Sequence, residues 1–160
     1  MTIGKGTKQS NSEEWHTPKA LFKMCCILAD IRPKLDVAAT SRNHFCQYYF
    51  TKEDDALKKD WLIKAGTKKT GIWCNAPGKQ VQKFVNRATQ QWLDHNLNII
   101  MLIPVNTITN GGFENVWNLF QNRYIDIIPL FGIRPKFLLE GKEQKWQSRN
   151  GYILLVFRKR

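Results

Sequence analysis

Gly71-Ile72-Trp73-Cys74-Asn75-Ala76-Pro77-Gly78 joins a short apolar run to a turn made of Asn, Pro and Gly, and an amphipathic segment follows at once. This order predicts a buried strand that ends in a tight turn and leads into a helix. In open α/β sheets, ligands bind outside the carboxyl ends of such strands. Asn75 presents an amide donor and a carbonyl acceptor at that place, but Asn also favours turns for purely local reasons. Asn75 is therefore either a site residue or only a turn former.

Strand and helix patterns alternate along the rest of the chain. The expected strands are 35–39, 45–50, 71–74, 98–105, 124–130 and 151–158, with a possible short strand at 134–139. The expected helices begin at Thr17 and span 80–95 and 113–122. This alternation favours a mainly parallel sheet with crossover helices. The continuous apolar run 98–105 indicates a central strand that is covered on both faces. Late strands separated by turns suggest an antiparallel edge, so the predicted class is α/β.

The helix expected over 80–95 carries apolar residues at helical spacing. Its core-facing stripe is predicted to contain Val81, Phe84, Val85, Ala88, Trp92 and Leu93. Residues 1–14 show no apolar pattern and are expected to be a flexible basic lead-in to a single domain over 15–160. The four cysteines lack paired spacing, which favours free and mostly buried thiols over disulfides or a metal site.

The chain is strongly basic. Twenty-five Lys and Arg against thirteen Asp and Glu give a formal net charge of +12. A field of this sign attracts polyanions, and nucleic acid is the partner that it suits best, although a merely soluble basic protein has the same property. Basic residues gather around one aromatic near the C-terminus: Arg134, Lys136, Lys142, Lys145, Trp146 and Arg149. Such a mixture is typical of a surface that follows a nucleic-acid backbone and stacks on bases, and a solvated loop is the alternative.

Six blocks of sequence occur in a characteristic order. They are Trp15-His16-Thr17-Pro18; Leu35-Asp36-Val37-Ala38-Ala39 with Asn43; Tyr49-Phe50-Thr51 with Asp55-Ala56-Leu57; Ile72 to Gly78; Met101-Leu102-Ile103-Pro104; and Gly132-Ile133-Arg134-Pro135-Lys136-Phe137. Together they resemble the compact phage-type Dam-like DNA N6-adenine methyltransferases over roughly residues 15 to 158. The resemblance implies a Rossmann-like fold that binds S-adenosylmethionine and acts on DNA, with RNA as the other possible nucleic acid.

The resemblance also implies places for individual residues. Thr17 and Pro18 would lie near the methionine end of the cofactor, and Asp36 would stand at the cofactor pocket. The cofactor-binding residues would be Thr17, Pro18, Asp36, Ala38, Asn43 and Asp55. The local alternatives are that Thr17 caps a helix, that Asp36 and Asp55 form turns, and that Asn43 is an exposed loop residue. With no apolar run of membrane length, the protein is expected to be intracellular, in the cytoplasm or nucleoid of the host cell, without a membrane partner.

Asn75, Ala76, Pro77 and Gly78 occupy the place of the family's catalytic N-P-P-Y block. In that block the Asn accepts a hydrogen from the adenine amine, and the aromatic residue stacks on the flipped base. Here Ala76 replaces the first Pro and Gly78 replaces the aromatic. The loss of the stack is expected to remove about 1–3 kcal/mol of base binding. Phe113 and Trp146 are candidate replacements for the ring, whereas Trp73 precedes Asn75 within the strand and is a poor one.

Two hypotheses follow from this block. The first is an active DNA adenine N6 methyltransferase. The second is a methyltransferase-like domain without catalysis that binds nucleic acid or stabilises a partner subunit. A nuclease is a weaker third, because Glu53-Asp54-Asp55 is better explained as a solvated acidic turn than as a metal site.

Overall fold

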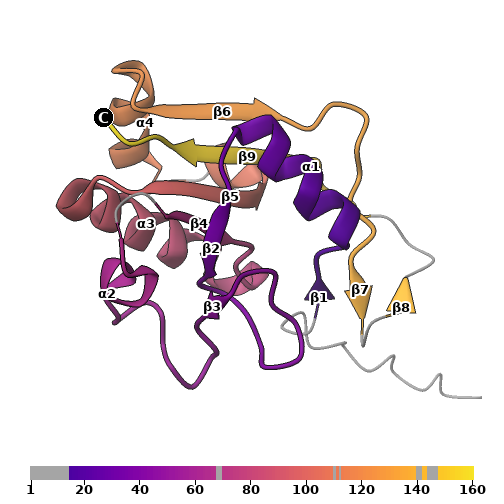
Figure 1. Cartoon of the computed structure of the whole chain (residues 1–160). Helices are drawn as coiled ribbons and strands as arrows, with labels where there is room; N and C mark the ends of the chain where they lie inside the picture. Colours follow the sequence, from indigo (N-terminus) through magenta and orange to yellow (C-terminus); the bar gives the residue numbers. More distant parts are fainter. Residues whose placement is uncertain (1–14, 68–69, 110, 112, 140–141, 144–147) are drawn as a thin grey trace, which may run out of the picture.

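The computed structural model describes residues 15–67, 70–109, 111, 113–139, 142–143 and 148–160; the predicted lead-in 1–14 lies outside them. In chain order (Figure 1), the elements are β1 (Trp15–His16), α1 (Lys19–Ala29), β2 (Pro33–Asp36), β3 (Tyr48–Tyr49), α2 (Trp61–Ala65), β4 (Gly71–Cys74), η2 (Gly78–Gln80), α3 (Val81–His95), β5 (Asn98–Pro104), η3 (Val105–Thr109), α4 (Glu114–Gln121), β6 (Ile125–Pro129), β7 (Leu138–Leu139), β8 (Lys142–Glu143) and β9 (Tyr152–Phe157).

A six-stranded sheet forms the centre of the fold. Its strand order is β3-β2-β4-β5-β9-β6. The first four strands are parallel, and β9 runs antiparallel to both of its neighbours, β5 and β6. This arrangement confirms the predicted α/β class with an antiparallel edge. Because β2, β4 and β5 are parallel neighbours, their carboxyl ends meet at one edge of the sheet.

The sheet is the middle layer of three. Along β5, Ile99, Met101 and Ile103 point into one hydrophobic core, whereas Ile100 and Leu102 point into another. Helix α1 packs on the second core, and α2, α3 and α4 contribute residues to the first. The central strand predicted over 98–105 is therefore confirmed, since alternate side chains are buried on both faces.

A second, three-stranded sheet lies beside the first in Figure 1 and has the order β1-β7-β8. Its pairing sets Trp15 opposite Leu139 and His16 opposite Leu138. The sequence indicates a possible short strand near 134–139 but not its partner, because two-residue strands carry almost no periodic signal. The sheet places residues that precede Thr17 against the segment that carries Phe137.

Three expectations need correction. Leu93 is 52% exposed, whereas the other five residues of the predicted stripe are buried, because Leu93 lies at the edge of the apolar face next to Trp92. The predicted strand 45–50 is reduced to Tyr48–Tyr49, and the predicted strand 35–39 begins and ends earlier, at Pro33–Asp36. Aromatic and small residues there enter loops instead, and these loops form part of the site.

Close packing and free thiols characterise the region around β4. A Cβ at Gly71 would collide with Ile31 Cγ2 and would lie 3.1 Å from the Arg32 carbonyl oxygen, so the strand begins where only glycine fits. Cys25, Cys46 and Cys74 are buried free thiols and Cys26 is half-buried, as the sequence predicts. Among the described helices, none combines the length and the apolar character needed to cross a membrane.

Candidate active site

Asn75 directly follows β4 and is partly buried. Its Nδ2 donates a hydrogen bond to Thr17 Oγ1 over 2.7 Å, although the two residues are 58 positions apart in the chain. Thr17 is only 4% exposed and does not cap α1, whose N-cap is Pro18 without a side-chain hydrogen bond. The contact unites the two sequence blocks that contain Thr17 and Asn75.

The rest of the turn changes from buried to open within three residues. Ala76 is buried in the core that α3 covers, Pro77 is half-buried, and Gly78 is exposed. The carbonyl oxygen of Pro77 accepts a hydrogen bond from the Gln80 amide at 2.8 Å, which starts the helical segment. A Cβ built on Gly78 meets no atom within 4 Å. The place of the family's stacking ring is therefore open space.

Two of the three candidate replacement rings, Trp73 and Phe113, are buried in the protein core. Trp73 is 1% exposed, and its ring meets Phe22 edge-on with centroids 5.0 Å apart. Phe113 is 4% exposed and belongs to the hydrophobic core. Trp146, the third candidate, lies outside the described residues. Neither Trp73 nor Phe113 is free to stack on a base.

Asp36 ends β2, the parallel neighbour of β4, and pairs in register with Trp73. Its carboxylate is turned towards the backbone: Oδ1 accepts from the Ala38 amide at 3.2 Å, and Oδ2 accepts from the Phe45 amide at 3.4 Å. Burial raises the pKa of Asp36 to about 6, and the two hydrogen bonds act in the opposite direction. Asp36 thus holds the loop that leaves β2.

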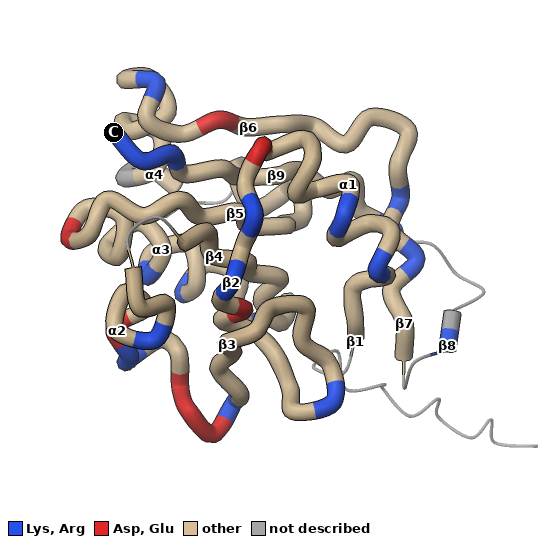
Figure 2. Tube along the Cα trace, viewed as in Figure 1, with Lys and Arg blue, Asp and Glu red and all other residues tan. Residues whose placement is uncertain are grey.

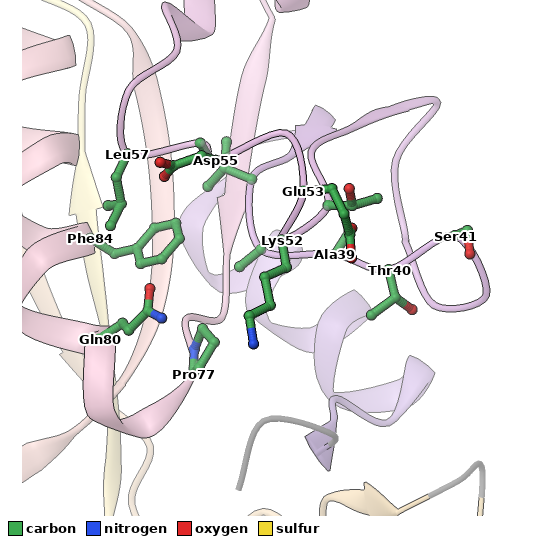
Figure 3. Close-up of a pocket in the computed structure, with 14 residues that line it drawn as sticks. Ala39, Thr40, Ser41, Lys52, Glu53, Asp55, Leu57, Pro77, Gln80 and Phe84 are labelled. Carbon is green, nitrogen blue, oxygen red and sulfur yellow. The ribbon is translucent and has the colours of Figure 1, made fainter. Parts of the chain in front are cut away.

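A pocket of about 670 Å³ opens beside that loop. Three segments line it: residues 37–41 after β2, the turn around 51–57, and the start of the α3 region, which contributes Pro77, Gln80 and Phe84. Figure 3 shows Gln80 and Pro77 on one side of the space, Ala39 and Thr40 on the other, and Lys52 extending between them. This volume is in the range of cofactor sites. Among the residues that the resemblance implies, Ala38, Asp55 and Pro77 line the pocket.

The acidic turn supplies the pocket's carboxylates. Glu53 and Asp55 both line the cavity. Asp54 accepts hydrogen bonds from the Thr51 amide and hydroxyl at 2.8 and 3.0 Å, which lower its pKa. Asp55 has a positive φ of 55° and pairs with Lys58 at 2.9 Å, and the hydrogen bond from Lys58 lowers its pKa. Carboxylates in these positions can accept hydrogen bonds from hydroxyl or ammonium groups.

Glu53 is a pocket residue that the sequence does not predict, and no sequence pattern indicates the contact between Thr17 and Asn75. The only available signal for Glu53 is its place directly after the Tyr49-Phe50-Thr51 block. Asn43 lies outside the described pocket lining; its backbone exchanges two hydrogen bonds with Thr40 in a tight turn, and the Thr40 hydroxyl accepts from its amide at 3.0 Å.

The structure brings some residues of the C-terminal basic segment close to one another. Arg134 is exposed and its Nη1 donates to the Arg149 carbonyl oxygen at 3.1 Å. The Ser148 amide donates a hydrogen bond to the Pro135 carbonyl oxygen at 3.0 Å, which holds the segments around these two residues side by side. Lys136 is half-buried and Lys142 lies exposed on β8, whereas Lys145 and Trp146 lie outside the described residues.

Acidic residues are less evenly distributed than basic ones. Figure 2 shows Lys and Arg on α1, on β8 and on the chain between β6 and β7, and also on β2, near α2 and at the C-terminus on the other side of the molecule. Asp and Glu gather on the opposite side, most densely in the turn that follows β3. Among the described residues, the side that carries the small sheet has basic residues and few acidic ones; we call it the basic side, and it is the side that would repel a polyanion least.

The fold and the site define a Rossmann-like protein of the methyltransferase class. The model of the DNA N-6-adenine-methyltransferase (Dam) family matches residues 4–160. The chain belongs to this family. It is 29% identical over 158 residues to a DNA N-6-adenine-methyltransferase of Haemophilus phage HP1 (strain HP1c1), covering 98% of this chain and 85% of the relative. It is 28% identical over 111 residues to a DNA N-6-adenine-methyltransferase of Escherichia phage T1, covering 66% of this chain and 42% of that relative.

Proposed function

We propose that this chain transfers a methyl group from S-adenosylmethionine to the exocyclic N6 of adenine in DNA. The observation that carries the proposal is the position of Asn75: it directly follows a central parallel strand, its amide donates a hydrogen bond to Thr17, and Pro77, two residues later, lines a cofactor-sized pocket. Members of the methyltransferase class use S-adenosylmethionine in general, and the proposal assigns that use to this pocket.

The pocket offers groups that suit each part of the cofactor. Leu57 and Phe84 provide apolar surface for a purine ring, and Glu53 and Asp55 provide acceptors for hydroxyl or ammonium groups. Ala38 lines the cavity with a small side chain that leaves room for a ligand. Asp36 contributes indirectly, because its carboxylate fixes the amides of Ala38 and Phe45.

The chemistry explains the need for an acceptor at Asn75. The lone pair of the adenine N6 is delocalised into the ring, which makes the amine a poor nucleophile. Asn75 Oδ1 would accept an N6–H hydrogen bond and return electron density to the nitrogen as it attacks the methyl carbon. In the transfer, the N6–C bond forms, the C–S bond breaks with its electron pair remaining on sulfur, and N6 releases a proton to solvent.

DNA would dock on the basic side of the molecule. Arg134, Lys136, Lys142 and Arg149 supply positive charge there, and phosphate contacts position a duplex without reading its sequence. Lys145 and Trp146 extend the same segment and remain predictions from the sequence. The loop over 107–112 and the segment 139–150 are the candidates for recognition of a particular site.

A second candidate function is binding without catalysis. The open space at Gly78 favours it, because neither Trp73 nor Phe113, the two described candidates for the missing ring, is free to stack on a flipped base. In that case the pocket and the basic side would be retained for a nucleic-acid-binding or partner-stabilising subunit. The two candidates differ in methyl transfer and not in DNA binding.

Calorimetric titration with S-adenosylmethionine tests the cofactor assignment. Ala38→Leu fills the pocket and is expected to weaken binding at least tenfold. Ala20→Leu makes the same change at an exposed position of α1 and serves as the matched control. Equal binding by both variants would contradict the assignment of the pocket.

Transfer of a radiolabelled methyl group then separates the two functions. Adenine-containing duplexes are expected to be labelled, and duplexes without adenine are not. Cofactor binding and salt-sensitive DNA binding without any transfer would support the second candidate instead.

The DNA surface is tested by the salt dependence of binding. Arg149→Ala is expected to reduce the slope of log affinity against log salt by about 0.9 if the side chain neutralises one phosphate. Lys83→Ala, at an exposed position of α3, is the control and should leave the slope unchanged. An unchanged slope in Arg149→Ala would place the DNA elsewhere.

A further inference from the structure

We infer that the ring of Phe131 enters the base stack of bound DNA and fills the place that a flipped base leaves. This inference rests on the proposed function only in taking DNA as the molecule that docks on the basic side. Among the described residues, Phe131 is the most exposed large hydrophobic side chain, at 85%. Exposure alone assigns no role, since single exposed hydrophobic residues are common and Ile63 on α2 is 81% exposed. The position of Phe131 in the fold carries the argument.

A tight turn holds this ring out in solvent. The Ile133 amide donates a hydrogen bond to the Leu130 carbonyl oxygen at 3.2 Å, which closes a turn over residues 130–133. Gly132 stands at the third position of the turn with φ 69°, a left-handed value that favours glycine. Leu130 is 5% exposed, and Ile133 packs against the core that α1 covers. Both ends of the turn are therefore anchored, and Phe131 stands at its tip.

The turn lies at the edge of the sheet that carries the candidate active site. Strands β4, β5 and β6 run in the same direction, because β4 is parallel to β5 and β9 is antiparallel to both β5 and β6. The registered pairs place Cys74 on the same level as Ile127. Asn75 directly follows that level on β4, whereas Phe131 comes only after β6 has ended. Three strand spacings separate β4 from β6, so the turn stands about 14 Å to the side of Asn75 and farther out from the sheet.

This geometry suits a side chain that replaces a flipped base. A base that is turned out of the stack by about 180° lies beside the duplex, so the gap that it leaves is to the side of the catalytic group and farther out. Apolar side chains such as Phe enter base steps, and their stacking offsets the cost of opening the step. The exposed Arg134 follows the turn and donates to the Arg149 carbonyl oxygen, which brings a second exposed arginine to this segment. Their positive charge suits the phosphates on either side of a gap.

Binding to a duplex with one abasic site tests the inference without methyl transfer. Such a site is a gap already, so a ring can enter it without displacing a base. The wild-type protein is expected to bind this duplex roughly 5- to 100-fold more tightly than the intact duplex, as one aromatic–base stack would allow. Phe131→Ala should lose this preference, and Phe131→Trp should keep it. Ile63→Ala removes a similarly exposed side chain from α2, whose chain leads into the amino end of β4 at the opposite edge, and should also keep it.

Fluorescence reports the insertion itself. A 2-aminopurine base placed next to the abasic site is quenched when an indole ring stacks on it. Phe131→Trp should therefore quench this base well beyond the wild-type protein. Ile63→Trp introduces the same ring on α2 and should quench it no more than the wild-type protein does.

The outcomes separate this inference from the proposed function. A preference for the abasic duplex that Phe131→Ala retains would overturn the inference, and so would equal affinity of the wild-type protein for both duplexes or no DNA binding at all. Methyl transfer to intact duplexes is measured independently. Transfer without the preference would support the proposed function and remove this role of Phe131. The preference without transfer would support the role of Phe131 and contradict the proposed catalysis.

Discussion

Two polar residues stand at the ends of neighbouring parallel strands, and they behave in opposite ways. Asp36 ends β2 and is 4% exposed, and both of its carboxylate oxygens accept hydrogen bonds from backbone amides of its own loop. Asn75 follows β4, is partly exposed, and receives its support from a residue 58 positions away. Asp36 therefore stabilises the loop beside the site, whereas Asn75 is the residue that we propose acts within it; burial and hydrogen-bond partners distinguish the two.

The strongest test of this contrast is Asn75→Ala. We propose that the side chain acts on the substrate, so the rate of methyl transfer should fall about 10²- to 10³-fold, as for the loss of one group that stabilises a transition state. The free energy of unfolding should fall by only about 1–2 kcal/mol, because Asn75 lies outside the core but its loss removes the hydrogen bond to the buried Thr17 hydroxyl. Single-turnover assays and urea titration measure the two effects. A large loss of stability would make Asn75 a structural residue like Asp36.

Asp36→Ala should show the opposite pattern. Two loop amides lose their acceptor, and the free energy of unfolding should fall by roughly 2–4 kcal/mol in urea titration. Asp94→Ala removes an exposed carboxylate on α3 and is the control, with an expected change within about 0.5 kcal/mol. Unchanged stability together with weaker cofactor binding would show that Asp36 contacts the ligand directly.

The pH dependence of the free energy of unfolding tests the role of Asp36 further. Its pKa is about 6 in the folded protein against an ordinary value of 3.8, so the folded state holds the proton more tightly than the unfolded state. The stabilising contribution is therefore complete below pH about 4 and is lost as the pH rises through about 6. Asp36→Asn does not titrate.

The measured quantity is the difference in free energy of unfolding between wild type and Asp36→Asn. It should fall by roughly 1–3 kcal/mol between pH 4 and pH 7. A difference that stays constant over this range would show that the carboxyl group titrates alike in the folded and unfolded states.

The smallest effect is expected at Gly78, which stands where the family has the aromatic ring that stacks on the flipped base. Gly78→Tyr places a ring in open space and should strengthen binding of an adenine-containing duplex by about 1–3 kcal/mol, if the flipped base lies there. The free energy of unfolding should change by less than about 0.5 kcal/mol. Gly78→Ala lacks the ring and should bind DNA as the wild type does. Equal affinities for the Tyr and Ala variants would place the base away from position 78.

The parts of the fold that were predictable depend on local patterns. The run 98–105 and the turn after Cys74 have strong apolar and turn signals, and both are confirmed as β5 and the end of β4. The prediction that Leu93 is buried is wrong because helical spacing does not locate the edge of a buried face to within one residue. The small sheet and the contact between Thr17 and Asn75 depend on distant pairings, which leave no local trace.

The place of β9 between β5 and β6 has a consequence for biosynthesis. Strand β6 is complete at Pro129, but its partner in the sheet ends only at Phe157. While the intervening residues are being translated, β5 and β6 each present an unpaired apolar edge, and such edges invite association with other nascent chains. Release of the chain through Phe157 closes the sheet, so premature termination before that point would yield an aggregation-prone product and not a smaller enzyme.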